Sequence, residues 1–167
     1  MRVGFGYDVH PLILGRKLIL GGEVIPYQKG LDGHSDADVL IHSLIDALLG
    51  AAGEGDIGQH FPDNDEQYKD ISSLKLLENT YEILKRNKLT INNIDVSVVL
   101  EEPRIAPFIM SMKNNIAQVL KISSEKVNIK ATTNENMGFI GRGEGIVSYC
   151  VVSLDDCTDQ NTVISDE

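Results

Sequence analysis

Three residues near the start of the sequence have the types and spacing of a metal site. Asp8 and His10 are two positions apart in a segment that alternates like a β-strand, so their side chains share one face. His42 follows in an apolar run with helical periodicity and can complete the set. Two imidazoles and one carboxylate suit zinc, and three protein ligands leave a fourth position open for substrate. A structural zinc would need a fourth protein ligand, for which the sequence offers no good candidate.

The surroundings of His42 leave two interpretations open. Asp38 and Asp46 each lie four residues from His42 on the expected helix, within reach of its ring N–H. They either accept that hydrogen bond or belong to a solvated helix face. His34 and Ser35 come just before this helix, where free backbone N–H groups can bind phosphate. Ser35 and Asp38 also have capping-box spacing, which predicts Ser35 as the N-cap.

Two further segments are rich in groups that could bind a substrate. The segment 56–65 combines carboxylates, Gly58 and Phe61, which suits a polyhydroxylated molecule but is also typical of a surface loop. The segment 130–145 combines four glycines with threonines, Glu135 and Arg142. Its hydroxyls and amides could hold phosphate and its carboxylate Mg²⁺, although a turn between two strands would look similar.

The composition describes a globular protein of one domain. The chain has 167 residues, 42% of them hydrophobic, and a formal net charge of −10. Such an acidic chain is not expected to bind nucleic acid or anionic membranes. No apolar run has the length of a membrane span, and no targeting segment is evident. We therefore expect a cytoplasmic protein, or one of a plastid-type organelle if this is a mature processed chain.

Strands alternate with helices along the sequence. We expect strands at Val3–Val9, Ile94–Leu100, Val127–Thr132 and Gly145–Leu154, a hairpin at Lys17–Ile25, a first helix ending at Gly53, further helices at Ser73–Asn87 and Pro107–Leu120, and a loop at Gly55–Asp70. This order predicts an α/β (α+β) fold with a single mixed β-sheet and helices packed on one face. Because the other face needs cover, a homo-oligomer is expected. Residues 1–155 form the predicted domain, and residues 156–167 a disordered acidic tail.

Six motifs occur in the order of a known enzyme family. They are Asp8-Val-His10, His34-Ser-Asp-Ala-Asp38, Gly55-Asp-Ile-Gly58, Phe61-Pro-Asp63, Lys130-Ala-Thr-Thr133 and Gly138-Phe-Ile-Gly-Arg-Gly-Glu-Gly145. Over roughly residues 1 to 155, the chain resembles the 2-C-methyl-D-erythritol 2,4-cyclodiphosphate synthases of non-mevalonate isoprenoid synthesis.

The resemblance implies a phosphorus-oxygen lyase that cyclises 4-diphosphocytidyl-2-C-methyl-D-erythritol 2-phosphate and releases CMP. It also implies a homotrimer with active sites at the subunit interfaces. One Zn²⁺ per subunit is implied on Asp8, His10 and His42, and Mg²⁺ or Mn²⁺ on Glu135 with the substrate phosphates. His34 and Thr133 are the implied catalytic residues, which stabilise the transition state.

The same resemblance implies two groups of substrate contacts. One subunit is expected to supply Asp8, His10, His34, Ser35, Asp56, Ile57, Gly58, Phe61, Pro62, Asp63, Asn64 and Asp65. The neighbouring subunit is expected to supply the cytidine and diphosphate side, from Leu100, Pro103, Arg104, Ile105, Ala106, Ala131, Thr132, Thr133, Asn134 and Glu135, and Phe139 and Arg142 complete the contacts.

The chain departs from the family pattern at a few positions. The stretch from Glu101 to Arg104 is more acidic than expected, and Asn134 and Asn136 replace Thr and Lys. These changes could alter nucleotide affinity. The residues alone also allow a zinc-dependent phosphoester hydrolase or a metal-containing binding protein without turnover.

Overall fold

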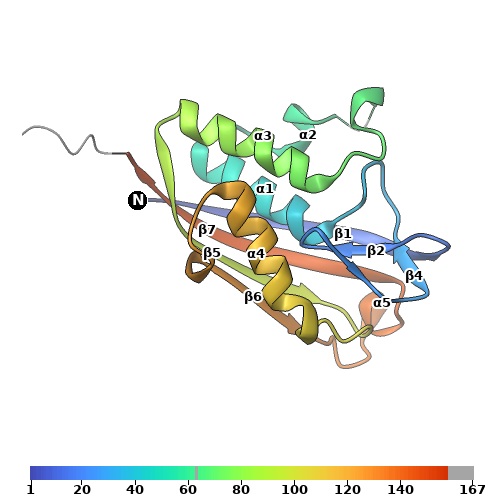
Figure 1. Ribbon diagram of the computed structural model, residues 1–167. Coiled ribbons are helices and arrows are strands. Elements are labelled where there is room, and N and C mark those ends of the chain that lie inside the picture. Colours follow the sequence, from blue (N-terminus) through green and yellow to red (C-terminus); the bar gives the residue numbers. More distant parts are fainter. Residues whose placement is uncertain (63, 158–167) are drawn as a thin grey trace, which may run out of the picture.

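The computed structural model describes residues 1–62 and 64–157 and contains one main five-stranded sheet (Figure 1). The strand order is β4-β1-β7-β5-β6, with β1 at Arg2–Leu14, β4 at Lys29–Leu31, β5 at Leu89–Val99, β6 at Val127–Thr132 and β7 at Gly145–Asp156. Strands β5 and β6 run parallel, whereas the other neighbours are antiparallel. The expected mixed sheet is therefore confirmed. The hairpin of β2 (Leu18–Leu20) and β3 (Glu23–Ile25) forms a small sheet of its own.

The three longer helices cover one face of the main sheet (Figure 1). Helix α1 (Val39–Ala52) packs on β1 and β7, α3 (Ser73–Arg86) lies against α1, and α4 (Ile109–Leu120) lies against α3 and β6. Short elements lie in the connections: α2 (Ile57–His60), α5 (Gly138–Gly141), and the 3-10 turns η1 (Glu66–Tyr68), η2 (Ala106–Phe108) and η3 (Ser124–Lys126). Helices on one face confirm the predicted fold class.

Some element boundaries differ from the predictions because tertiary contacts decide them. The expected loop at 55–70 contains α2 and η1, and α2 is capped by Asp56, whose carboxylate accepts from the Gln59 N–H. Strand β4 was not expected; it forms by pairing with the far end of β1, which continues to Leu14. Strand β7 extends to Asp156, so the expected tail begins one residue too early, and residues 158–167 lie outside the described part.

The other face of β1 and β7 carries exposed apolar side chains. Val3 is 64% exposed and Phe5 61%, and the same face carries Tyr7, Val9, Tyr149 and Val151. This surface is the uncovered sheet face that the sequence predicted, and we call it the outer apolar face. In the described residues, no helix combines the length and the apolar character that crossing a bilayer requires.

Candidate metal centre and substrate pockets

The metal-site residues come together because α1 lies very close to β1. Gly4 and Gly6 face the helix, and a Cβ built at either would lie 1.9 Å from a backbone oxygen of α1. Asp8 and His10 follow at the next two positions of the same strand face. His42 lies in the first turn of the helix and points toward them. Glycine spacing on the strand therefore sets how near the helical ligand approaches the two strand ligands.

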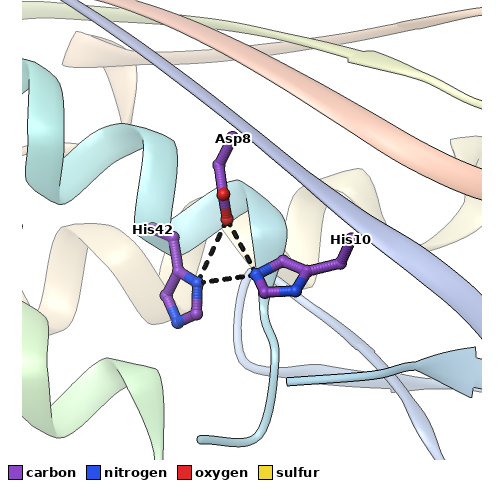
Figure 2. A group of neighbouring side chains, drawn as sticks. All are labelled: Asp8, His10 and His42. Carbon is purple, nitrogen blue, oxygen red and sulfur yellow. Dashed lines mark hydrogen bonds and ion pairs between the residues drawn. The ribbon is translucent and has the colours of Figure 1, made fainter. Parts of the chain in front are cut away.

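Asp8, His10 and His42 form a compact triangle of donor atoms (Figure 2). Asp8 Oδ2 lies 3.0 Å from His10 Nε2 and 3.1 Å from His42 Nδ1, and the two nitrogens lie 3.1 Å apart. Around a tetrahedral zinc with ligand distances of about 2.0–2.1 Å, neighbouring ligand atoms lie about 3.3 Å apart. The donor set therefore fits zinc with only a small expansion. Among the described residues the group has these three members, which leaves the fourth position open.

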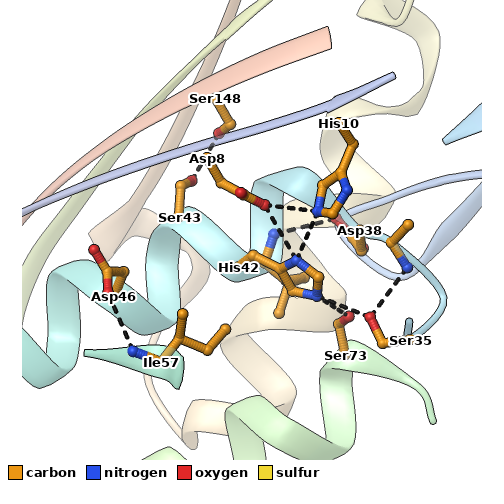
Figure 3. A network of polar contacts seen from close by, with 12 residues as sticks. Asp8, His10, Ser35, Asp38, His42, Ser43, Asp46, Ile57, Ser73 and Ser148 are labelled. Atoms are coloured by element: carbon orange, nitrogen blue, oxygen red, sulfur yellow. Dashed lines mark hydrogen bonds and ion pairs between the residues drawn. The ribbon is translucent and has the colours of Figure 1, made fainter. Parts of the chain in front are cut away.

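The other nitrogen of each imidazole is also held. His10 Nδ1 lies 2.7 Å from the carbonyl oxygen of Asp32, and since a carbonyl only accepts, Nδ1 is the donor. Its Nε2 is thereby left to point at the centre of the triangle. His42 Nε2 lies 3.0 Å from Ser35 Oγ and 2.9 Å from Ser73 Oγ (Figure 3). Such outer contacts are typical of metal-ligating histidines.

Neither Asp38 nor Asp46 accepts a hydrogen bond from the ring of His42. The interpretation that one of them orients this ring is therefore wrong. Asp46 accepts a hydrogen bond from the backbone N–H of Ile57 at 3.2 Å. Asp38 is fully buried and is the N-cap of α1, accepting from the N–H of Ile41 at 3.1 Å. The predicted N-cap, Ser35, lies before this position and instead accepts from the N–H of Ala37.

Asp38 also joins the β2–β3 hairpin to α1. Its carboxylate accepts from the N–H groups of Gly21 at 3.0 Å and Gly22 at 2.7 Å. Burial raises the pKa of Asp38 to about 6, and the charge of Asp36 acts in the same direction against the three N–H donors. The capping-box spacing therefore predicted the N-terminus of α1 correctly, but the capping residue is Asp38 and not Ser35.

The carboxylate of Asp8 is in a different electrostatic situation. Burial raises its pKa, but hydrogen bonds and attraction from His10 and His42 outweigh burial and leave the pKa well below its ordinary value. Asp8 therefore remains ionised over the whole physiological range, as a metal ligand requires.

The triangle lies beside a cavity of about 230 Å³. Among the predicted residues, its walls contain Asp8, His10, His34, Ser35, His42, Ile57, Gly58 and Phe61. Residues that the sequence reasoning did not single out also line it: Tyr7, Gly33, Tyr68 and Leu76. Gly33 could have been noticed as the glycine before His34; a Cβ there would lie 2.9 Å from the ring of His10. We call this cavity the metal-side pocket.

Several predicted contacts from the same region lie outside the metal-side pocket. Asp56 is exposed and bonds Gln59, and Asp65 caps η1 while its carbonyl oxygen lies 3.3 Å from His34 Nε2. Pro62 and Asn64 do not line the cavity either. Asp63 lies outside the described residues.

The residues expected to hold cytidine line a second, separate cavity. This space of about 430 Å³ is bounded by Leu100, Glu101, Pro103, Arg104, Ile105, Ala106, Ala131, Thr132 and Thr133, and we call it the nucleotide-side pocket. It shares no lining residue with the metal-side pocket. A single chain thus presents the two predicted groups of contacts in two different places.

The expected ligand of the second cation lies beside the nucleotide-side pocket. Thr133 Oγ1 donates to Glu135 Oε1 at 3.2 Å. Glu135 and Asn136 have positive φ angles of 51° and 60°, which cost energy for side-chain-bearing residues. The carboxylate of Glu101 accepts from the N–H groups of Asn134 at 2.9 Å and Asn136 at 3.1 Å, and so holds this turn. The unexpected acidic residue at position 101 therefore has a structural role.

Two other predicted contacts lie in neither pocket. Arg142 is exposed and makes a two-point ion pair with Glu144, at 2.8 and 3.0 Å. Phe139 is 42% exposed and lies next to Gly145, at the start of β7. Within one chain, neither side chain lines the cavity beside the metal triad.

Arg16 is a further residue that the sequence reasoning missed. Its guanidinium donates to Asp32 Oδ1 at 3.2 Å, to the Gly33 carbonyl at 2.9 Å and to the Ser35 carbonyl at 2.9 Å. It thereby holds the loop whose Asp32 carbonyl orients His10 and whose Ser35 contacts His42. No local pattern around Arg16 points to this role, because its partners lie at least 16 residues further along the chain.

The fold and the pocket together define a class of protein. Two candidate ligands on strand β1, one on the covering helix and an open fourth position beside a cavity are typical of a metal-dependent enzyme. More particularly, the model of the YgbB family matches residues 1–155, and the chain belongs to this family. The relative from Desulforamulus reducens, a 2-C-methyl-D-erythritol 2,4-cyclodiphosphate synthase, is 59% identical over 154 residues, which are 92% of this chain and 98% of that relative.

Solved structures share the fold over nearly the whole chain. The bifunctional IspDF from Campylobacter jejuni has a TM-score of 0.89 and 43% identity, covering 92% of this chain and 42% of that one. The CDP complex of IspF from Plasmodium falciparum has a TM-score of 0.83 and 31% identity, covering 94% and 97%. These similarities confirm the resemblance that the six motifs indicated, and they do not favour the hydrolase or the binding protein.

Proposed function

We propose that the chain catalyses the cyclisation of 4-diphosphocytidyl-2-C-methyl-D-erythritol 2-phosphate to 2-C-methyl-D-erythritol 2,4-cyclodiphosphate and CMP, as a lyase of isoprenoid precursor synthesis. The carrying observation is that the metal triad lines one cavity together with part of the residues implied to bind phosphate and methylerythritol, namely His34, Ser35, Ile57, Gly58 and Phe61. Residues 1–155 act as a single synthase domain. We infer a cytoplasmic enzyme, in keeping with its bacterial relatives.

The reaction needs alignment rather than a nucleophilic side chain. An oxygen of the 2-phosphate forms a bond to the β-phosphorus, and the bond from that phosphorus to the oxygen bridging to the α-phosphate breaks. The electron pair leaves with CMP, so no oxidant or reductant is needed. Holding the two phosphates in line makes the step intramolecular, which can lower the barrier by several kcal/mol.

The chain supplies two sets of groups for this alignment. Asp8, His10 and His42 would hold Zn²⁺, and Glu135 would hold Mg²⁺ or Mn²⁺ together with the substrate phosphates. Bound in this way, the cations supply Lewis-acid polarisation and neutralise charge on the phosphates. His34 and the Ser35 hydroxyl lie at the wall of the same cavity and bind phosphate oxygens.

The carbon skeleton of the substrate needs a less polar wall. Ile57, Gly58 and Phe61, which also line the cavity, would provide it and exclude water from the methylerythritol part. Thr133 donates a hydrogen bond to the diphosphate and stabilises its charge during the transfer. In the free chain that hydroxyl donates to Glu135.

We further propose that the complete site forms between two subunits of a homotrimer. Two observations support this arrangement: the metal-side and nucleotide-side pockets share no residue, and no element among the described residues covers the outer apolar face. The nucleotide-side pocket of the neighbour would then bind the cytidine group. The CDP in the Plasmodium falciparum complex is consistent with such a ligand.

The test is ³¹P NMR of the purified protein with 4-diphosphocytidyl-2-C-methyl-D-erythritol 2-phosphate and Mg²⁺, with and without a zinc chelator. The expected result is CMP and two coupled cyclic-diphosphate signals, which the chelator suppresses. Linear phosphates would instead favour a hydrolase. A protein that binds zinc but does not convert the substrate would instead favour a metal-containing binding protein.

A further inference from the structure

The two nitrogens of His42 face two different groups of atoms (Figure 3). Nδ1 faces Asp8 Oδ2 and His10 Nε2, each at 3.1 Å. Nε2 faces the hydroxyls of Ser35 and Ser73. A neutral imidazole carries one hydrogen, and only its other nitrogen can bind a metal. The position of that hydrogen therefore decides whether His42 can act as the third ligand.

The hydroxyl of Ser73 settles this position because its own hydrogen is already engaged. Ser73 Oγ donates a hydrogen bond to Asp36 Oδ1, and the Ser73 N–H donates to Asp36 Oδ2 at 2.9 Å. A carboxylate only accepts, and a hydroxyl has a single hydrogen. Toward His42, Ser73 can therefore only accept, so in the neutral ring His42 Nε2 carries the hydrogen and Nδ1 is the nitrogen that can bind a metal beside Asp8 and His10.

Ser35 does not impose the same choice. Its oxygen accepts from the N–H of Ala37 at 3.1 Å, and its hydrogen remains able to turn toward either His42 or the cavity. Ser35 alone would be compatible with both tautomers of His42. The position of the hydrogen on His42 is therefore set by Ser73 and by Asp36 behind it, and not by Ser35.

Burial and further hydrogen bonds hold this pair in place. Ser73 is fully buried at the start of α3, so water does not compete for its hydroxyl. Asp36 accepts from the N–H of Asp38 at 3.2 Å, and its own N–H donates to the Ile71 carbonyl at 3.1 Å. The carboxylate is thus fixed between the loop before α1 and the first turn of α3.

We propose that Asp36 and Ser73 are positioning residues that set the tautomer of His42 and so prepare the metal site before the cation arrives. The inference rests on the proposed metal site. It assigns α3 a part in metal binding, although α3 supplies no ligand.

Two variants test the proposal in the full-length protein. Ser73→Ala removes the obligatory acceptor. Asp36→Asn places an amide there, whose NH₂ group can donate to Ser73, so that the Ser73 hydrogen turns toward His42 Nε2. Ser72→Ala is the matched control, since Ser72 is the exposed neighbour and its side chain makes no capping hydrogen bond. Asp36 is only half buried, so its variant is available if Ser73→Ala fails to fold.

The first measurement is the long-range ¹H–¹⁵N spectrum of the histidine rings in the metal-free protein. We expect the Nε2–H tautomer of His42 in the wild type and in Ser72→Ala, a mixture in Ser73→Ala, and the Nδ1–H tautomer in Asp36→Asn. The second is zinc affinity by competition with a chromophoric chelator, which should fall by about 10- to 100-fold in both variants and not in the control.

The outcomes separate this inference from the proposed function. Wild-type tautomer and zinc affinity in both variants would overturn it. Weakened zinc binding with an unchanged tautomer would also overturn it, since that would be a general structural effect. A wild-type protein that binds no zinc would refute the metal site itself, while the tautomer spectra of the metal-free variants would still decide the role of Asp36 and Ser73.

Discussion

At the scale of single residues, His42 is the ligand whose removal is most informative. His42→Ala should lower zinc affinity by more than about 100-fold and abolish turnover, because two ligands remain where three are needed. Metal content by atomic absorption checks this. His60→Ala is the control, since its ring contacts the Glu54 carbonyl at 2.8 Å outside the triad. Full zinc occupancy in His42→Ala would remove His42 from the ligand set.

Glu135 should affect the second cation and not the first. Glu135→Gln is expected to retain zinc but to raise the Mg²⁺ concentration for half-maximal activity by roughly tenfold, because carboxylate oxygens are the ligands that Mg²⁺ prefers. Titrating activity with Mg²⁺ measures the change. Glu125→Gln, an exposed site on η3, should behave as the wild type. An unchanged titration in Glu135→Gln would exclude the proposed role.

Asp38 predicts a specific pH dependence of stability. Its pKa of about 6 in the folded protein lies above the value of about 3.9 in an unfolded chain, so folding favours the protonated form. The resulting stabilisation is complete below about pH 4 and is lost as the pH rises through about 6. Relative to Asp38→Asn, the metal-free wild type should therefore lose up to about 3 kcal/mol of unfolding free energy between these limits. Urea titrations at both pH values measure it; parallel curves for the two proteins would contradict the assignment.

At the scale of elements, two glycines at the α1–β1 contact and on α1 should respond in opposite ways to substitution by alanine. A Cβ at Gly6 would lie 1.9 Å from the Ser43 backbone oxygen, so Gly6→Ala must displace the helix that carries His42. We expect a loss of about 3 kcal/mol in unfolding free energy and weaker zinc binding. Gly50, on the same helix, has nothing within 4 Å of a built Cβ, so Gly50→Ala should gain about 0.5–1 kcal/mol. Chemical denaturation with zinc titration distinguishes them; equal stabilities would mean that α1 is not held by Gly6.

The elements also show which parts of the site a sequence can predict. The alternation of a strand was enough to place Asp8 and His10 on one face, and the glycine at position 53 was enough to predict the end of α1, where the structure has a left-handed φ of 78°. The role of Ser73 was not predictable, because it meets His42 across 31 residues of chain and depends on how α3 packs against α1. Strand β4 was missed for the same reason: three residues form a strand only because β1 is beside them.

At the scale of the whole molecule, the proposed homotrimer with sites shared between subunits predicts rescue between inactive subunits. His42→Ala damages the metal-side pocket and Thr133→Ala the nucleotide-side pocket, so each homotrimer should be inactive. In randomly mixed trimers, roughly a quarter of the interfaces would join two intact halves and recover activity in proportion. Co-refolding the two variants and assaying CMP release tests this. The separately refolded variants, combined afterwards, are the control, and no recovery in true mixed trimers would place each site within one chain.

The strand order has a consequence for how the protein is made. Strand β7 lies between β1 and β5 in the sheet, yet it is the last of the three to leave the ribosome. Until then β1 has no partner along the edge where Arg2–Pro11 later pair with β7. All three proposed metal ligands are synthesised early, but most of the strand that carries two of them has no sheet partner until nearly the whole chain has emerged. Translation that stalls before β7 would therefore release a chain with two open, apolar strand edges, a substrate for chaperones or for aggregation.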